Sequence, residues 1–272
     1  MVNIIRRFSP AKLNLGLRIM GLRPDGYHSL DSTFVPIDFG DELEIRKSPS
    51  MNLVVEWAAD APRKDSLPKK EENLLWKILM AVSTKTTDAW EVKLTKRIPL
   101  GSGLGGGSSN AGTLLCYFLS LGFNESFIRK LAVGLGADVP FFLSPVPSKV
   151  QGKGEIITPL GNHVSYPSFF FLVFPPQGSS TKRVFELFDQ SPTTARSGND
   201  LEEAAIQLLP ELGEILSALR GTAPAYCSIS GSGSTCFAAY HSREQLTHSS
   251  KVLTAICRER DWKNLTATTY SE

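Results

Sequence analysis

The chain has 272 residues, of which 42% are hydrophobic and 21% are charged, and its formal net charge is +2. This composition is typical of a globular protein with one large domain or two of usual size. The balanced charge and the scattered lysines and arginines argue against nucleic acid or an acidic membrane as partner. A small molecule is the expected ligand.

Cysteine spacing and the chain's first residues bear on the compartment. Cys116, Cys227, Cys236 and Cys257 show no C-x-x-C spacing and no accompanying histidine cluster, so we predict reduced, buried thiols rather than zinc ligands or disulfides. The N-terminus resembles neither a signal nor a transit peptide, and the longest apolar run, 169–174, is far too short to cross a bilayer. We expect a cytoplasmic protein, in a bacterial cytosol.

In the first half, apolar periodicity predicts mainly strands, then helices around a glycine-rich loop. Asn73 is a candidate helix N-cap, and Gly136 a candidate helix end. The expected strands are 13–19, 32–39, 42–46, 52–57 and 90–95, and the expected helices are 74–82, 111–119 and 127–135.

The second half mixes strands and helices without strict alternation, which favours an α+β fold over a doubly wound sheet. The breaker-rich segment 144–148 suggests that the first domain ends soon after it, so we expect domains at 1–160 and 161–272. The expected helices are 181–188, 201–209, 212–219 and 243–260, and the expected strands are a buried one at 169–174, two flanking 230–234, and one at 265–269.

The loop between the predicted strand 90–95 and helix 111–119 is the clearest functional signal. It consists of Pro99, Leu100, Gly101, Ser102, Gly103, Leu104, Gly105, Gly106, Gly107, Ser108 and Ser109. A glycine-rich turn that leads into a helix presents backbone N–H groups to an anion such as phosphate. A flexible linker is the alternative, but a linker needs neither strand nor helix beside it. The common P-loop lysine is absent, so a cation must come from elsewhere.

Three other segments carry candidate chemistry. Lys12 shares a strand face with Asn14 and is either a solvated lysine or the missing cation. Asp138, in an otherwise uncharged segment, is either a turn residue or a base for an alcohol. The second glycine-rich turn, 230–235, is locally best explained as a hairpin connection, although it could also leave backbone open beside a phosphate chain.

These segments together resemble a known family. Residues 10–15, the 99–109 loop, 137–140 and 230–234 resemble the motifs of the GHMP small-molecule kinase superfamily, in the same order. Residues 23–30, the triple glycine of the loop and Gly152-Lys153-Gly154-Glu155 are similar to the branch that acts on a cytidine-linked alcohol. The resemblance covers about 8 to 240.

The resemblance implies a two-domain fold, with an N-terminal domain like domain 2 of ribosomal protein S5 and a ferredoxin-like C-terminal domain. It implies transfer of the γ-phosphoryl group of ATP to the 2-hydroxyl of a cytidine diphosphate-linked methylerythritol. Asp138 would be the base, Lys12 its charge partner, and the 99–109 loop the phosphate cradle. Mg²⁺ would be carried by the nucleotide, with no direct metal ligand expected from the chain.

The same resemblance assigns the remaining site residues. Tyr27 and His28 would lie against the cytosine, which an aromatic face followed by a ring nitrogen suits. Asn14 would lie near the alcohol end and Asn73 near the nucleotide. Phe185 would be a second aromatic side chain against the cytosine. The alternative is a core residue, because its spacing from Phe188 places both on one helix face. Tyr27 as a plain turn aromatic is the alternative.

Two departures and two rival functions remain. Ser102 replaces the usual Ala or Gly, and the prolines within 144–148 replace a Gly/Ala segment, which puts substrate contacts there in doubt. One rival is a kinase of another alcohol, such as mevalonate or homoserine, for which Tyr27 and His28 would have no purpose. The other is a silent nucleotide-binding relative, which would be expected to lose Lys12 or Asp138.

Overall fold

The computed structural model describes residues 4–161, 164–192 and 198–271, and its internal contacts divide the chain into two compact units. The first unit combines Met1–Ala11, Phe39–Pro99 and Gly105–Pro145, and the second combines Lys12–Asp38, Leu100–Leu104 and Val146–Glu272. The chain passes between units within two long strands and within the glycine-rich loop. The predicted domain boundary near residue 160 stays a prediction.

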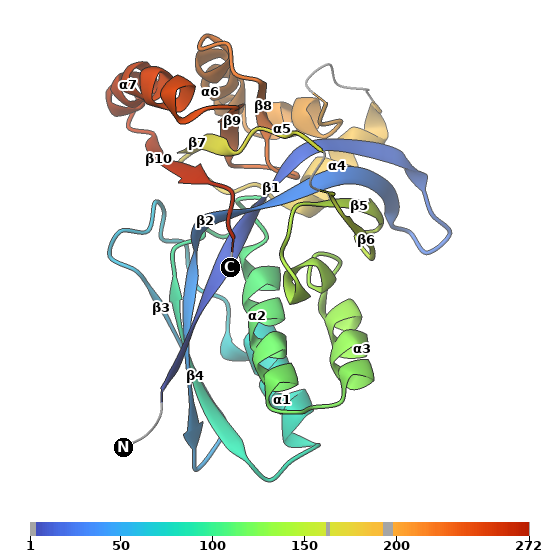
Figure 1. Cartoon of the computed structure of the whole chain (residues 1–272). Coiled ribbons are helices and arrows are strands. Elements are labelled where there is room, and N and C mark those ends of the chain that lie inside the picture. The colour runs from blue at the N-terminus through green and yellow to red at the C-terminus, as the bar shows by residue number, and fades with distance from the viewer. Residues whose placement is uncertain (1–3, 162–163, 193–197, 272) are drawn as a thin grey trace. The chain divides into compact units, whose positions relative to one another are not determined.

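The first unit is a sheet with helices on one side (Figure 1). The end of β2 pairs antiparallel with β4, which pairs parallel with β3. Apolar faces of the helices and of these strands form one buried core. The elements are β1 (Ile5–Leu22), β2 (His28–Ser48), β3 (Asn52–Trp57), η1 (Lys70–Glu72), α1 (Leu74–Ser83), β4 (Ala89–Lys96), α2 (Gly106–Ser120), α3 (Glu125–Leu135) and η2 (Pro140–Leu143), with β1 and β2 extending into the second unit.

Two of the predicted strands are one strand. The sequence predicted separate strands at 32–39 and 42–46, and this was wrong, because β2 runs unbroken through Gly40. Gly40 does not turn the chain. A Cβ atom there would lie 2.3 Å from the carbonyl oxygen of Ser9, so the glycine lets β2 continue close against β1.

The second unit contains an antiparallel sheet in the order β10-β7-β9-β8. Its interior strand β7 matches the prediction of a buried strand at 169–174. The short strands β5 and β6 were not predicted, and β5 pairs with the start of β2. The elements are β5 (Ser148–Gly152), β6 (Ile156–Pro159), β7 (Phe169–Phe174), α4 (Thr181–Gln190), α5 (Glu202–Leu208), α6 (Glu211–Arg220), β8 (Tyr226–Ile229), β9 (Cys236–Tyr240), α7 (Arg243–Glu259) and β10 (Lys263–Thr268).

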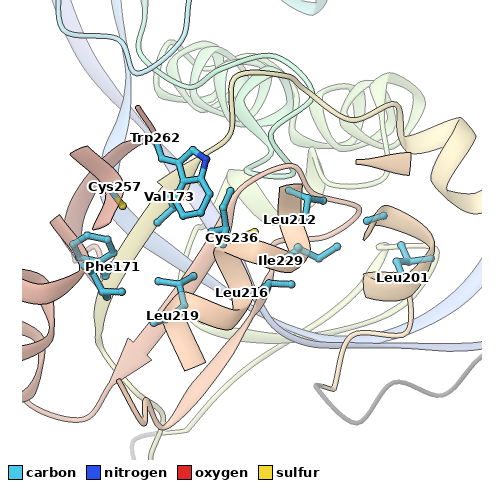
Figure 2. Close-up of a cluster of buried hydrophobic side chains, with 14 of the residues drawn as sticks. Phe171, Val173, Leu201, Leu212, Leu216, Leu219, Ile229, Cys236, Cys257 and Trp262 are labelled. Atoms are coloured by element: carbon cyan, nitrogen blue, oxygen red, sulfur yellow. The ribbon is translucent and has the colours of Figure 1, made fainter. Parts of the chain in front are cut away.

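The core of the second unit lies between this sheet and its helices (Figure 2). Phe171 and Val173 from β7 pack with Leu216 and Leu219 from α6, and all four are buried. Cys236 is also buried there. Across the residues that the structure describes, no helix is both long and apolar enough to span a bilayer.

Because Cys227 is largely buried, we expect the free energy of unfolding to fall at alkaline pH. Burial raises the pKa of this thiol from 9.0 to about 12, so the unfolded chain loses the proton first as the pH rises. The contribution of the protonated Cys227 thiol to the free energy of unfolding is therefore complete below pH 9. Between pH 9 and 12 it falls by about 1.4 kcal/mol per pH unit. Urea unfolding at pH 8 and pH 10 should show this fall, and Cys227→Ala should make it shallower. An equal fall in both proteins would contradict the assignment.

Candidate active site

The first half of the glycine-rich loop packs tightly within the second unit. Gly101 and Gly103 have φ of 60° and 75°, a region that L side chains rarely adopt. A Cβ at Gly103 would lie 1.9 Å from the carbonyl oxygen of Ser230, and one at Gly101 would lie 2.7 Å from that of Ser179. These two glycines are therefore required by the protein's own backbone packing.

The second half of the loop, in the first unit, is more open. Gly105 adopts the left-handed conformation, with φ of 71°, and caps α2 without any side-chain hydrogen bond. A Cβ at Gly106 would meet the Ile98 side chain at 2.8 Å, whereas one at Gly107 would meet nothing within 4 Å. Gly107 is exposed in the first turn of α2, where backbone N–H groups lack helical acceptors. Packing does not explain this glycine, but close approach of an anion would.

The two serines that end the loop differ in their surroundings. Ser109 is fully buried, and its hydroxyl donates to the carbonyl oxygen of Pro10 at 2.6 Å and contacts the Ser9 hydroxyl at 2.8 Å. Ser108 is half-buried, and its Oγ lies 3.8 Å from the position that a Cβ on Gly136 would occupy. The first turn of α2 therefore lies beside the segment that leads to Asp138.

Asp138 is half-buried in the turn between α3 and η2, in the first unit. The helix end predicted at Gly136 is confirmed. η2 packs on α2 so closely that a Cβ on Gly112 would lie 2.4 Å from the Cβ of Phe142. This packing fixes the position of the Asp138 turn next to the helix that follows the loop.

Lys12 is buried in the second unit, so its interpretation as a solvated lysine was wrong. Its side chain is 4% exposed, its Nζ donates to Asn14 Oδ1 at 2.5 Å, and it lies 4.8 Å from the Phe34 ring. Asn14 Nδ2 in turn donates to Ser32 Oγ at 2.9 Å. The predicted common face of Lys12 and Asn14 is therefore confirmed.

The second glycine-rich turn lies against this pair. It connects β8 to β9 as a hairpin, as the local prediction had it. A Cβ on Gly231 would lie 3.4 Å from both Lys12 Nζ and Asn14 Oδ1, and the Ser230 hydroxyl donates to the Gly103 carbonyl at 3.0 Å. Hairpin, loop and lysine thus come together, although they are far apart in sequence.

The three residues predicted to contact the cytosine, Tyr27, His28 and Phe185, lie within the second unit. The His28 ring stacks on Phe185, with centroids 4.9 Å apart, and its Nε2 lies 2.8 Å from Asp189 Oδ1. Tyr27 is 57% exposed, with Lys153 Nζ 5.0 Å from its ring centroid. Phe185 is half-buried, so it is both a partner of His28 and a member of the core edge.

Asn73 is the N-cap of α1, as predicted, with its Oδ1 accepting from the Leu75 N–H at 2.9 Å. This bond uses the side-chain oxygen of Asn73. In the described part of the chain, no group of three or more His, Cys, Asp or Glu side chains could hold a metal.

The sequence analysis did not identify two carboxylates near the predicted site residues. Asp189 partners His28 from 161 residues away, and Asp41 is fully buried beside Lys96 near the root of the loop. Asp189 is an exposed residue directly after a predicted helix, and Asp41 lies directly before a predicted strand. No local pattern distinguishes either carboxylate from an ordinary surface residue.

Comparison with known proteins agrees with this arrangement. Residues 73–145 match the GHMP kinases N terminal domain, and residues 186–259 match the GHMP kinases C terminal family. The 4-diphosphocytidyl-2-C-methyl-D-erythritol kinases of Methylacidiphilum infernorum and Ruegeria pomeroyi are 35% and 34% identical over 88% of the chain, covering 87% and 89% of those proteins.

A solved structure extends the likeness to the fold. The crystal structure of a 4-(cytidine 5'-diphospho)-2C-methyl-D-erythritol kinase is similar with a TM-score of 0.78 and 28% identity, over 98% of this chain and 100% of that one. The two-domain α+β architecture expected from the motifs is therefore confirmed. The chain belongs to the GHMP kinase family, and within it to the 4-diphosphocytidyl-2-C-methyl-D-erythritol kinases.

Proposed function

We propose that this protein transfers the γ-phosphoryl group of ATP to the 2-hydroxyl of 4-diphosphocytidyl-2-C-methyl-D-erythritol, in the non-mevalonate route to isoprenoid precursors. The main observation in favour of this substrate is that the rings of His28 and Phe185 are stacked. Tyr27, next to His28 in the sequence, is exposed. Flat rings and a ring nitrogen suit a pyrimidine. Relatives with names for this activity cover most of the chain, which supports the same conclusion.

In the proposed reaction, the phosphates lie at the first turn of α2, where Gly107 leaves the backbone open. Asp138 accepts the proton of the attacking 2-hydroxyl, and the hydroxyl oxygen then displaces ADP in line. Lys12 supplies positive charge that offsets the negative charge developing on the phosphoryl group during transfer. Asn14 fixes the Lys12 ammonium through the 2.5 Å hydrogen bond and lies near the alcohol end.

In this proposal Mg²⁺ enters the site bound to the nucleotide phosphates and is not held by side chains of the protein. The Ser109 hydroxyl donates to the Pro10 carbonyl oxygen, and the described residues include no group of three His, Cys, Asp or Glu side chains that could hold a metal. When bound, the ion neutralises charge on the phosphate oxygens. Asn73 would contact the nucleotide through its amide nitrogen, because its oxygen caps α1.

A substrate panel tests the proposal. We expect ATP turnover with the cytidine-linked methylerythritol and little with mevalonate or homoserine. Tyr27→Ala should raise KM for the cytidine compound by about tenfold and change kcat little, because stacking stabilises substrate and transition state alike. The measurement is coupled ADP release. Preference for a plain alcohol would reject the proposed substrate, and a large kcat loss in Tyr27→Ala would reject its role as a binding residue.

A further inference from the structure

We infer that Asn110 is a positioning residue, which, with Asp41, holds the two ends of the glycine-rich loop together so that the first turn of α2 meets the nucleotide phosphates. The inference rests on the proposed function, because it concerns the same phosphate site. Neither residue belongs to the loop, and neither side chain is needed to contact ATP.

The Asp41 carboxylate is fully buried and accepts four hydrogen bonds. Its Oδ1 accepts from the backbone N–H groups of Arg97 and Ile98, at 2.7 and 2.8 Å. These residues directly precede the loop. Its Oδ2 accepts from Lys96 Nζ at 2.6 Å and from Asn110 Nδ2 at 3.0 Å. One carboxylate therefore holds the backbone that enters the loop and the helix that leaves it.

Asn110 extends this connection to β1. It is 3% exposed in the first turns of α2, directly after Ser109. Its Oδ1 accepts from the Ser9 hydroxyl at 2.9 Å, while its Nδ2 donates to Asp41. Both ends of the amide are thus used, which fixes the amide orientation and the rotation of the helix. Ser9 lies in the part of β1 that belongs to the first unit, so the same bonds set α2 against this part of the strand.

Stability alone does not account for this arrangement. A buried ion pair such as Asp41–Lys96 commonly stabilises a fold no more than apolar side chains of similar volume would. Four directional bonds to one carboxylate, by contrast, define where each donor lies. Misplacement of a binding group by about 1 Å can cost about a hundredfold in rate. The hydrogen bonds to Asp41 are therefore better explained by positioning of the loop than by stabilisation of the fold.

The test uses Asn110→Ala in the full-length protein, because this change leaves Asp41 paired with Lys96. We expect the Kd for a non-hydrolysable ATP analogue, measured by calorimetry with Mg²⁺, to rise about tenfold. KM for the cytidine substrate should change less than twofold. Cys116→Ala is the matched control, since Cys116 lies on the same helix with its Sγ 3.2 Å from the Leu143 carbonyl oxygen. It should lower Tm without changing the Kd.

Ser9→Ala provides a second and milder variant. It removes the hydroxyl that Asn110 accepts from, so it should raise the Kd, and the double variant should bind no worse than Asn110→Ala alone. An unchanged Kd in both single variants, or an equal rise in Cys116→Ala, would overturn the inference. Failure of the wild type to phosphorylate the cytidine compound, with ATP binding intact, would instead reject the proposed function and leave the Kd comparison valid.

Discussion

Asp138→Asn is expected to lower kcat by about a thousandfold and to leave KM for both substrates nearly unchanged. A positioned general base contributes about 10²- to 10⁴-fold to a rate. Asparagine keeps the shape of the side chain but cannot accept the proton of the attacking hydroxyl. Asp138 is half-buried in a turn, so the fold should tolerate the exchange. Steady-state ADP release, together with Tm, measures both effects.

The control for this prediction is Asp88→Asn in the same unit. Asp88 is exposed and pairs with Lys47 at 2.8 Å, an exposed ion pair of a kind that contributes about 0 to 1 kcal/mol. Its loss should leave kcat unchanged. If Asp138→Asn also kept near-normal kcat, Asp138 would not be the base, and the resemblance would have transferred the wrong role to this position.

Elements with a clear period and a local boundary signal were predicted well from the sequence. The alternation over 90–95, the apolar run 169–174 and the cap at Asn73 each depend on residues that are neighbours in the chain. β5 and β6 were missed because they are only five and four residues long, follow two prolines and lack alternation. The prediction divided β2 into two strands around Gly40, where the glycine allows close strand approach and the strand continues.

The candidate site shows the same division. The loop, Lys12 and Asp138 were proposed as site residues from their own segments and from the family motifs, and their roles stay predictions. The reason for each glycine could not be read from the sequence, because a Cβ at Gly103 would meet Ser230, which is 127 residues away in the chain, whereas a Cβ at Gly107 would meet nothing within 4 Å. The sequence treats these glycines alike. Only the tertiary structure separates those that serve packing from the one that leaves space.

Gly103→Ala is the second prediction with a large effect. The new Cβ would lie 1.9 Å from the Ser230 carbonyl oxygen, and the residue has φ of 75°. Backbone strain and overpacking together should lower the free energy of unfolding by about 3 kcal/mol, which corresponds to a Tm lower by about 10 °C. Thermal unfolding followed by circular dichroism measures this. A Tm within about 2 °C of the wild type would show that the hairpin moves freely away from the loop.

Gly107→Ala is the matched counterpart, because the two glycines belong to one loop but meet different surroundings. A Cβ at Gly107 has no protein atom within 4 Å, so alanine in the first turn of α2 should leave stability unchanged or raise it by about 0.5 kcal/mol. The same methyl group would occupy space that the phosphates need, and KM for ATP should rise about tenfold or more. If KM for ATP stayed unchanged, the phosphates would lie elsewhere than at this turn. Loss of stability in one variant and of ATP affinity in the other would divide the loop into a packing half and a binding half.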